Sequence, residues 1–550
     1  RALQMILGSR VLSGREAVKW GLADDGARTT AELAQARDRV MSRALKKGKR
    51  PKQKLPLRGF RQKLLESTSL GRRLIFRVAR RVMGRRVPDD MPAPQEAFDA
   101  IRVGVNQGIN TGLAQEREAA GRLALTPACR HLVNVFLQRE QARKSSDETK
   151  SNLNKVGVVG AGTMGAGIAQ LASIRGCEVH VQEVNEEALG RGILTIEGLF
   201  KQALAKGVLS PRQYAERLDS IKGTVNWNGF ATVDLVIEAA LEDMDIKKKV
   251  LATLSEKTRA NAILATNTSS LSVSELQEGM EYPERVAGIH FFNPVHKMEL
   301  IEVIRGEKTS EETATRLMTW AREMGKTPVL VKDSPGFLVN RILMPYLNEA
   351  VLLVVEGMGV DSIDRIMKRF GMPMMGPLEL LDQVGLDIAA HIAESMQPHF
   401  GERFESNPAF EKIKKTDWLG KKSGAGFYRY KGKKKKVNKD LVRLLRHGVE
   451  ASSDRQLTQK VRTQQARDRM VLSMVNEAAA CLEEGIVAEA QKLDLAMILG
   501  TGWAPHRGGP LHYADDRGIK EIVEALTQLA SRHGKRLQPC EALSNREKFY

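Results

Sequence analysis

A glycine-rich turn between a strand and a helix constrains the fold of this chain more than any other feature. Residues 155–167 read KVGVVGAGTMGAG, in which the apolar, β-branched run Val156–Val159 predicts a buried parallel strand. Glycines then follow with the spacing G-x-G-x-x-G, and a helix-compatible stretch comes next. This order of strand, tight turn and helix is typical of a doubly wound α/β sheet.

The same turn is a candidate dinucleotide site. Gly160 permits the tight turn, Gly162 lets the main chain approach a pyrophosphate, and Gly165 lets the helix pack closely on the strand. A second predicted strand, Glu178–Gln182, is followed by Glu183, whose carboxylate can accept hydrogen bonds from a ribose 2′-OH. The carboxylate would repel a 2′-phosphate, so the sequence predicts NAD as the cofactor. A glycine turn without a ligand is the plainer alternative.

Size and cysteine content limit the remaining possibilities. The chain has 550 residues, too many for one core, and its hydrophobic content of 42% is enough for several globular domains. Its four cysteines are scattered without C-x-x-C or zinc spacing, so no metal site is predicted. No apolar run approaches the length of a membrane span. The chain begins at Arg1 rather than Met, so we expect a piece of a longer protein.

The positive charge is concentrated in one stretch. The net charge is +20, and residues 41–86 hold seventeen Lys and Arg against the single acid Glu66. Within this stretch an amphipathic helix is predicted at 70–82, with apolar residues Leu70, Leu74, Val78 and Val82 and arginines Arg72, Arg73, Arg77, Arg80 and Arg81. Such a helix fits an anionic membrane or a protein partner, or it packs on a neighbouring domain with its arginines in water. Aromatic residues make up only 5% of the chain, so no nucleic-acid partner is expected.

The end of the chain contains an internal repeat. The tetrapeptide LNEA at 347–350 returns as VNEA at 475–478, an offset of 128, and GPL at 376–378 returns at 509–511. We therefore expect two matching helical domains in tandem. The predicted segments are 1–30, a helix-turn-helix remnant; 31–154, a basic helical linker region; 155–335, the sheet domain; 336–432 and 433–550, the two helical copies; with the lysine-rich Lys431–Lys439 as a linker.

Polar residues that follow predicted strands form a candidate catalytic centre. His290 follows the strand Val286–Ile289, and Glu302 lies twelve residues further on. A histidine side chain has a pKa near 6.5, so it can take a proton from an alcohol near neutral pH while a carboxylate orients it. Ser269 and Asn340 are candidates to hold the reacting oxygen. The alternative is structural, with a hydrogen-bonded histidine, a solvent-facing glutamate and a helix-capping serine.

The chain resembles the L-3-hydroxyacyl-CoA dehydrogenase family, and within it the α-subunits of multifunctional fatty-acid β-oxidation complexes. The matching motifs are GAGTMGAGIAQ (160–170), NTSSL (267–271), HFFNPV (290–295), PGFLVNR (335–341), GPLELLDQVGLD (376–387) and KKSGAGFY (421–428). The resemblance implies a Rossmann-type doubly wound α/β sheet domain followed by two tandem all-α domains, the second of which imitates a partner subunit. It also implies that residues 1–30 are the tail of a crotonase (enoyl-CoA hydratase) domain whose catalytic residues lie upstream.

The resemblance implies NAD-dependent oxidation of L-3-hydroxyacyl-CoA to 3-ketoacyl-CoA. His290 falls on the family's base, Glu302 on its orienting partner, and Ser269 and Asn340 on the substrate contacts. The residues implied or predicted to bind the cofactor are Gly160, Gly162, Thr163, Met164, Gly165, Glu183, Glu242, Lys247 and Asn267, with Glu238 a less certain candidate.

The resemblance also implies partners and a location. Besides the acyl-CoA substrate we expect a thiolase β-subunit, and the basic helix is a candidate for contact with thiolase or a membrane. A bacterial cytoplasm is the expected location, with the mitochondrial matrix as the alternative. Two other functions stay open, namely a dehydrogenase of small hydroxy acids and a non-catalytic scaffold that keeps the fold.

Overall fold

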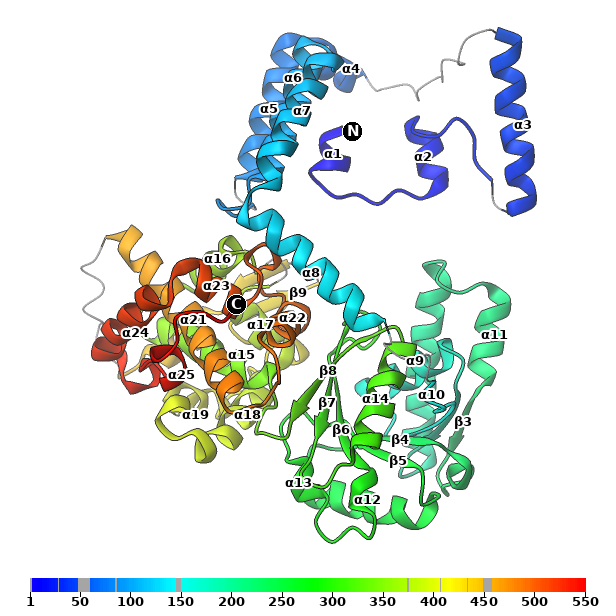
Figure 1. Ribbon diagram of the computed structural model, residues 1–550, viewed down its shortest axis with the longest axis vertical. Coiled ribbons are helices and arrows are strands. Elements are labelled where there is room, and N and C mark those ends of the chain that lie inside the picture. The colour runs from blue at the N-terminus through cyan, green and yellow to red at the C-terminus, as the bar shows by residue number, and fades with distance from the viewer. Residues whose placement is uncertain are drawn as a thin grey trace. The chain divides into compact units, whose positions relative to one another are not determined.

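The computed structural model divides the chain into two compact units, Arg1–Cys129 and Arg130–Tyr550 (Figure 1). It describes residues 2–27, 29–47, 60–84, 87–144, 150–372, 375–405, 407–432, 434–448 and 458–550. Residues 48–59 and 85–86 of the basic stretch 41–86 therefore lie outside the described residues.

The first unit is helical throughout its described elements (Figure 1). They are α1 (Ala2–Ile6), α2 (Gly14–Trp20), α3 (Thr30–Lys47), α4 (Phe60–Ser67), α5 (Ser69–Met83), α6 (Ala93–Gln107) and α7 (Ile109–Ala124), and α8 (Pro127–Arg143) spans the boundary in the sequence. The turn before α2 is fixed by a capping box, in which Ser13 accepts a hydrogen bond from the main chain of Glu16 and the Glu16 carboxylate accepts one in return.

Helix α5 contains the basic amphipathic helix expected at 70–82. Its buried side is formed by Phe76 and Met83, which join Phe98 of α6 in a small core, with the Phe76 and Phe98 rings edge-to-face at 5.7 Å. The predicted apolar row lies on another side and is between 46% and 75% exposed at Leu70, Leu74, Val78 and Val82. The row is therefore not what holds α5 in its own unit.

The second unit contains an eight-stranded sheet of order β3-β2-β1-β4-β5-β6-β7-β8. The strands are β1 (Lys155–Val159), β2 (Glu178–Gln182), β3 (Ile221–Thr224), β4 (Leu235–Glu238), β5 (Ile263–Thr266), β6 (Val286–Phe291), β7 (Leu300–Arg305) and β8 (Thr327–Lys332). The predicted doubly wound sheet is confirmed, with parallel pairing from β3 to β6. Strand β7 runs antiparallel to β6, because the connection 292–299 is too short for the crossover that a parallel neighbour requires.

Helices pack on the sheet and form a hydrophobic core with its strands. They are α9 (Thr163–Ile174), α10 (Glu186–Ala205), α11 (Pro211–Asp219), α12 (Met244–Lys257), the short α13 (Val273–Leu276) and α14 (Glu311–Glu323). Strand β1 is buried after its exposed first residue, Lys155, and Val156 and Val158 are completely buried, as expected for a central strand with helices on both faces.

The rest of the second unit is predominantly helical (Figure 1). Its first part holds α15 (Val339–Val355), α16 (Val360–Phe370), α17 (Pro377–Val384), α18 (Leu386–Phe400), α19 (Pro408–Lys414) and α20 (Lys439–Arg446), and its second part holds α21 (Gln459–Glu483), α22 (Ala490–Thr501), α23 (Pro510–Arg517), α24 (Ile519–His533) and α25 (Glu541–Ser544).

The expected linker Lys431–Lys439 is wrong. Strands β9 (Tyr428–Lys431) and β10 (Lys434–Val437) form an antiparallel hairpin, and α20 follows at once. Arg446 of α20 donates hydrogen bonds to the Val354 and Met358 carbonyls, so α20 packs on the first helical part. In β9 the sequence alternates, with Tyr428 and Tyr430 separated by a charged residue, but the lysines of β10 show no apolar alternation. Only half of the hairpin therefore carries a strand pattern in the sequence.

The internal repeat is visible as a reciprocal exchange between α15 and α21. Arg341 Nε donates to Glu477 Oε1 at 2.7 Å, and Arg469 Nε donates to Glu349 Oε2 at 2.7 Å. Residues 341 and 469, and 349 and 477, are each 128 positions apart. Arg469 is thus the repeat counterpart of Arg341, and Glu477 is the counterpart of Glu349. The two ion pairs are equivalent when the copies are exchanged, which is the contact pattern of a two-fold symmetric interface.

Both copies also use an aspartate to hold the helix that follows their GPL motif. In the first copy Asp364 accepts hydrogen bonds from the Leu378 main chain at 2.9 Å and from the Tyr428 hydroxyl at 2.6 Å. In the second copy Asp494 accepts the corresponding bonds, whose donors are Leu511 and Tyr550. The predicted tandem duplication thus extends to matching side-chain contacts.

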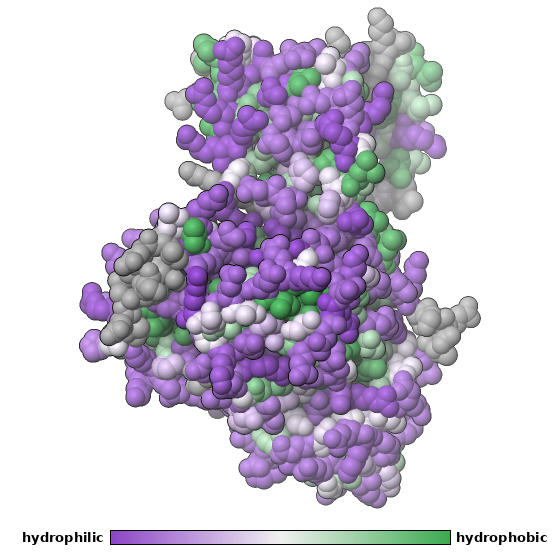
Figure 2. Space-filling model, turned by 60° about the vertical axis from the view of Figure 1, so that its left-hand side comes forward, coloured by the Kyte–Doolittle hydropathy of each residue, from purple (hydrophilic) through white to green (hydrophobic). Residues whose placement is uncertain are grey.

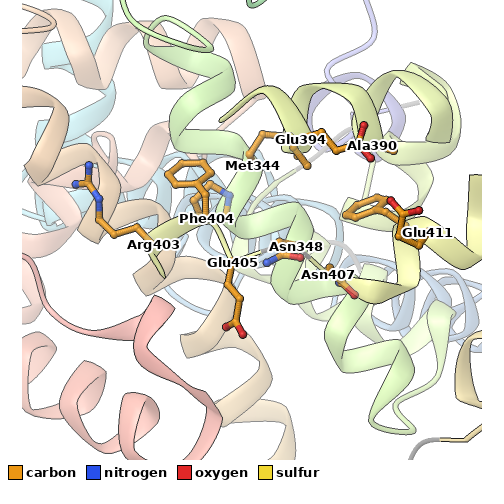
Figure 3. Close-up of a pocket in the computed structure, with 12 residues that line it drawn as sticks. Met344, Asn348, Ala390, Glu394, Arg403, Phe404, Glu405, Asn407 and Glu411 are labelled. Atoms are coloured by element: carbon orange, nitrogen blue, oxygen red, sulfur yellow. The ribbon is translucent and has the colours of Figure 1, made fainter. Parts of the chain in front are cut away.

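The copies differ at an asparagine on the paired helices. Asn476 donates to the Gln538 carbonyl and accepts from the Cys540 main chain. Its counterpart Asn348 lines a small pocket between α15, α18 and α19, where its Oδ1 and Asn407 Nδ2 are buried and have no partner among the described residues (Figure 3). The cavity of about 30 Å³ has room for water but not for a CoA thioester.

Hydrophilic side chains cover most of the face in Figure 2, with apolar residues in small groups between them. Of the helices in the described ranges, none is both long and apolar enough to cross a membrane.

Candidate active site

The predicted catalytic pair is formed by two neighbouring strands. His290 on β6 lies directly opposite Glu302 on β7 in the antiparallel register. Directly opposed side chains on one face are close enough to interact, and here His290 Nδ1 lies 2.7 Å from Glu302 Oε2. Both residues are buried, with 7% of His290 and none of Glu302 exposed. Because Nδ1 contacts the carboxylate, Nε2 is the nitrogen left for a substrate.

Glu302 also joins the sheet to the helical part. Its Oε1 accepts hydrogen bonds from the main-chain N–H groups of Leu338 and Val339 at 3.2 and 2.9 Å. These groups begin α15, where helix N–H groups have no partner within the helix. Phe337 precedes them and packs near the His290 ring, with 5.8 Å between ring centroids. The start of α15 is thereby fixed against the catalytic strands.

Ser269 and Asn340, the predicted substrate contacts, come together in the structure. Asn340 Nδ2 donates to the Ser269 carbonyl at 3.1 Å, and the Ser269 hydroxyl donates to Glu242 Oε1 at 2.8 Å. Glu242 also accepts from the Ser269 main chain and the Thr268 hydroxyl. Burial alone would raise the pKa of Glu242, but the Lys247 ammonium and these hydrogen bonds outweigh it and hold the pKa below its usual value.

Lys247 and Glu238 form a buried ion pair beneath this group. Neither is exposed, and Lys247 Nζ lies 2.9 Å from both Glu238 carboxylate oxygens and 3.5 Å from Glu242. Glu238 also accepts bonds from the Ala240 main chain and the Thr266 hydroxyl. Glu238, a further candidate for the cofactor site, therefore has both carboxylate oxygens hydrogen-bonded inside the protein, where it fixes the position of the Lys247 ammonium.

The glycine turn has the shape that a dinucleotide requires. Gly160 has φ 90°, in the left-handed region that favours glycine, and a Cβ on Gly165 would lie 1.8 Å from the Gly160 carbonyl oxygen. Gly162 precedes α9, and a Cβ there would meet open space. Glu183 Oε1 accepts a hydrogen bond from the Ala161 main chain at 2.7 Å, which places the carboxylate beside the turn. These residues fit the pyrophosphate and ribose of NAD.

The remaining predicted cofactor residues lie around the same end of the sheet. Thr163 and Met164 form the first turn of α9, on its accessible side. Asn267 follows β5, and its Oδ1 accepts a hydrogen bond from the Phe291 main chain at 3.0 Å, which links the ends of β5 and β6. The carboxyl ends of the parallel strands thus bring the predicted cofactor residues and His290 to one edge of the sheet, as the α/β rule predicts.

Sequence reasoning missed Lys326. Its buried ammonium donates to the Val295 and Met298 carbonyls in the loop between β6 and β7. Burial, followed by the neighbouring Arg175, lowers the pKa of Lys326 to about 8. The lysine stabilises the loop that joins the two catalytic strands. Only the tertiary structure identifies it, because a single lysine before a predicted strand carries no sequence signal.

Comparison with known proteins places this geometry among characterised folds. Residues 155–334 match the family "3-hydroxyacyl-CoA dehydrogenase, NAD binding domain", and residues 336–430 match the C-terminal domain of the same enzyme. The fatty acid oxidation complex subunit alpha of Shewanella loihica is 35% identical over 560 residues, which cover all of this chain and 77% of that protein.

Two solved structures share the fold. The 3-hydroxybutyryl-CoA dehydrogenase from Escherichia coli K12 aligns with a TM-score of 0.62 at 29% identity, over 72% of this chain and 98% of that one. The dehydrogenase part of multifunctional enzyme 1 from C. elegans aligns with a TM-score of 0.53 at 26% identity, over 75% and 96% of the two chains.

Proposed function

Because the chain belongs to the 3-hydroxyacyl-CoA dehydrogenase family, we propose that His290 is the base that removes the substrate hydroxyl proton. The chain is an NAD-dependent 3-hydroxyacyl-CoA dehydrogenase of fatty-acid oxidation. The observation that carries the proposed role is the 2.7 Å contact between His290 Nδ1 and Glu302, which leaves Nε2 available.

Each proposed step follows from the contacts around that histidine. The Glu302 carboxylate accepts a hydrogen bond from the Nδ1–H group of His290, which fixes the tautomer with a lone pair on Nε2. The same carboxylate stabilises the imidazolium that forms when Nε2 takes the hydroxyl proton. The Asn340 amide and the Ser269 hydroxyl are proposed to hold the reacting oxygen as it changes from alcohol to carbonyl. NAD, when bound along the glycine turn, supplies the hydride acceptor. The product is the 3-ketoacyl-CoA.

The proposal is tested by following NADH absorbance with L-3-hydroxyacyl-CoA substrates of several chain lengths and with the matching free hydroxy acids. His290→Gln should lose most of kcat and keep NAD affinity. His296→Gln is a matched control, since His296 is an exposed histidine in the loop that follows the same strand. Equal rates on free acids would support a small hydroxy-acid dehydrogenase instead. A folded, NAD-binding wild type that shows no activity would support the scaffold.

We also propose a thiolase β-subunit as the protein partner. The relatives are named α-subunits of a fatty acid oxidation complex, which supports a complex with a second subunit. The full-length protein is further proposed to carry enoyl-CoA hydratase activity upstream of this sequence. Its proposed location is the bacterial cytoplasm, with the mitochondrial matrix as the alternative; fractionation of the source cells would decide between them.

Helix α5 is the proposed site of contact with thiolase or a membrane. Its support is the exposed apolar row beside five arginines, a combination that fits an anionic surface. Leu74→Ser with Val78→Ser should reduce binding to vesicles that contain phosphatidylserine, or to thiolase in a pull-down. If neither binding changes, and neutralising the five arginines also has no effect, the proposal is wrong.

A further inference from the structure

A groove lies away from the predicted catalytic residues, at the edge strand β8 of the sheet. It has a volume of about 540 Å³, within the range of roughly 300–1,000 Å³ that small-molecule sites occupy. Strand β8 forms its floor, and α14, the end of α8 and the start of α22 form its walls. The apolar side chains that line it include Met318 of α14, Leu330 of β8, Leu495 of α22, and Ile486 from the connection between α21 and α22.

Arg322 of α14 brings a positive charge into this apolar lining. Its Nε donates to the Ala142 carbonyl at 3.0 Å, which fixes the guanidinium at the wall. No carboxylate within the described ranges forms an ion pair with Arg322, and burial alone lowers its pKa. Three further cations line the groove, of which Arg305 and Lys492 form ion pairs with Glu311 and Glu489. The lining also includes the carboxylates of Glu307 and Asp333, and Asp333 accepts hydrogen bonds from Ser272 and Ser274. A half-buried guanidinium without a carboxylate partner favours an anionic ligand.

The main chain of β8 argues against a peptide strand as this ligand. Thr327 and Asp333 donate their N–H groups toward β7, so the N–H positions that face the groove are 328, 330 and 332. Pro328 has no N–H, and the Lys332 N–H already donates to the Ile486 carbonyl at 2.8 Å. One free donor is too few to pair an added strand, so a small molecule fits the groove better.

We propose that this groove binds a carboxylate carried on an acyl chain, such as a free fatty acid. The guanidinium of Arg322 pairs with the carboxylate, and the apolar middle of the groove covers the chain. None of His290, Glu302, Ser269 and Asn340 lines the groove, so this site is separate from the proposed catalytic residues and does not depend on the proposed role of His290.

The test measures dodecanoate binding by titration calorimetry, with the catalytic site saturated by NAD and 3-ketobutyryl-CoA. Dodecanoate should still bind the wild type. Arg322→Gln should weaken this binding at least about tenfold, because it removes a charge-assisted pair. Ala488→Trp should abolish it, because Ala488 lines the groove and is exposed, so that a large side chain fills the space without disturbing a core. Arg365→Gln, an exposed arginine on α16, is the matched control.

Dehydrogenase rates of both groove variants should stay within about twofold of wild type, which shows that they are folded. Dodecanol should bind the wild type more weakly than dodecanoate does. In Arg322→Gln, dodecanol should bind no more weakly than dodecanoate. The proposal is wrong if 3-ketobutyryl-CoA displaces all the dodecanoate. It is also wrong if neither substitution changes the affinity.

Discussion

Replacing Glu302 by glutamine tests the catalytic pair with almost no change of shape. Glu302 accepts three hydrogen bonds, one from His290 and two from the main-chain N–H groups of Leu338 and Val339. A glutamine has one oxygen and one NH₂ group, so it can satisfy these neighbours in only one orientation. Its oxygen then faces the two N–H groups and its NH₂ faces His290.

That orientation gives His290 the wrong tautomer. The NH₂ group must donate to Nδ1, so the ring proton moves to Nε2, where the base has to accept the substrate proton. The reverse orientation keeps the productive tautomer but points the NH₂ group at two buried donors. Leaving each donor unsatisfied costs about 1–3 kcal/mol, so this orientation lies about 2–6 kcal/mol higher. The productive fraction falls accordingly, and kcat should decrease roughly 30-fold to 10⁴-fold.

The assay compares kcat, KM and NAD affinity of wild type and Glu302→Gln under identical conditions. Glu299→Gln is the matched control, because Glu299 lies three residues earlier and, among the described residues, forms its ion pairs with the partly exposed Arg139 and Arg143. Exposed pairs contribute little, so its kcat should stay within about threefold. If Glu302→Gln keeps more than a tenth of wild-type kcat, the tautomer argument is refuted.

Three further changes test other parts of the structure. Glu183→Arg should weaken NAD binding and improve the relative affinity for NADP, measured by fluorescence titration of both reduced cofactors, since the carboxylate beside the glycine turn is lost. Arg469→Met should lower the free energy of unfolding by about 3–5 kcal/mol in urea, because Glu349 loses a buried partner, whereas Arg365→Met should change it by less than about 1 kcal/mol. Folding lowers the pKa of Lys326 to about 8, so above that pH the unfolded chain binds more protons than the folded one. This lysine therefore makes the free energy of unfolding rise between about pH 8 and pH 10. In Lys326→Met that rise should be smaller by up to about 3 kcal/mol.

The sequence predicted those parts of the site that depend on local order along the chain. The glycine turn, Glu183 and the strand ends that carry Ser269 and His290 follow from strand-turn-helix patterns, which determine the edge of the sheet at which each residue lies. The spacing of His290 and Glu302 suggested a pair, but only the antiparallel register of β6 and β7 places them opposite each other. A parallel β7 would have lain in a different register.

Features that depend on packing between distant segments were not predictable. The burial of Glu238 with Lys247 requires that β4 and α12 meet, and the contacts of Lys326 require that β8 reach the loop after β6. The exposure of the apolar row on α5 could not be predicted either. Amphipathic spacing shows that a helix has an apolar side, but Phe76 and Met83, which lie off the predicted row, are the residues that pack on Phe98.

The duplicated helical domain separates residues needed for the interface from those needed for chemistry. Arg341 and its counterpart Arg469 make the same buried contact across the pseudo-two-fold axis. The neighbouring position differs, since Asn340 corresponds to Asp468, 128 residues later. Asp468 forms a two-point ion pair with Arg517 at 3.0 and 3.1 Å, so it has no amide to offer a substrate and its carboxylate is already occupied. An Asp468→Asn variant should therefore be less stable, but it should not gain a second substrate site. Calorimetric titration with a 3-ketoacyl-CoA should still show one site per chain. Two sites would contradict the view that the second copy serves only as a built-in partner of the first.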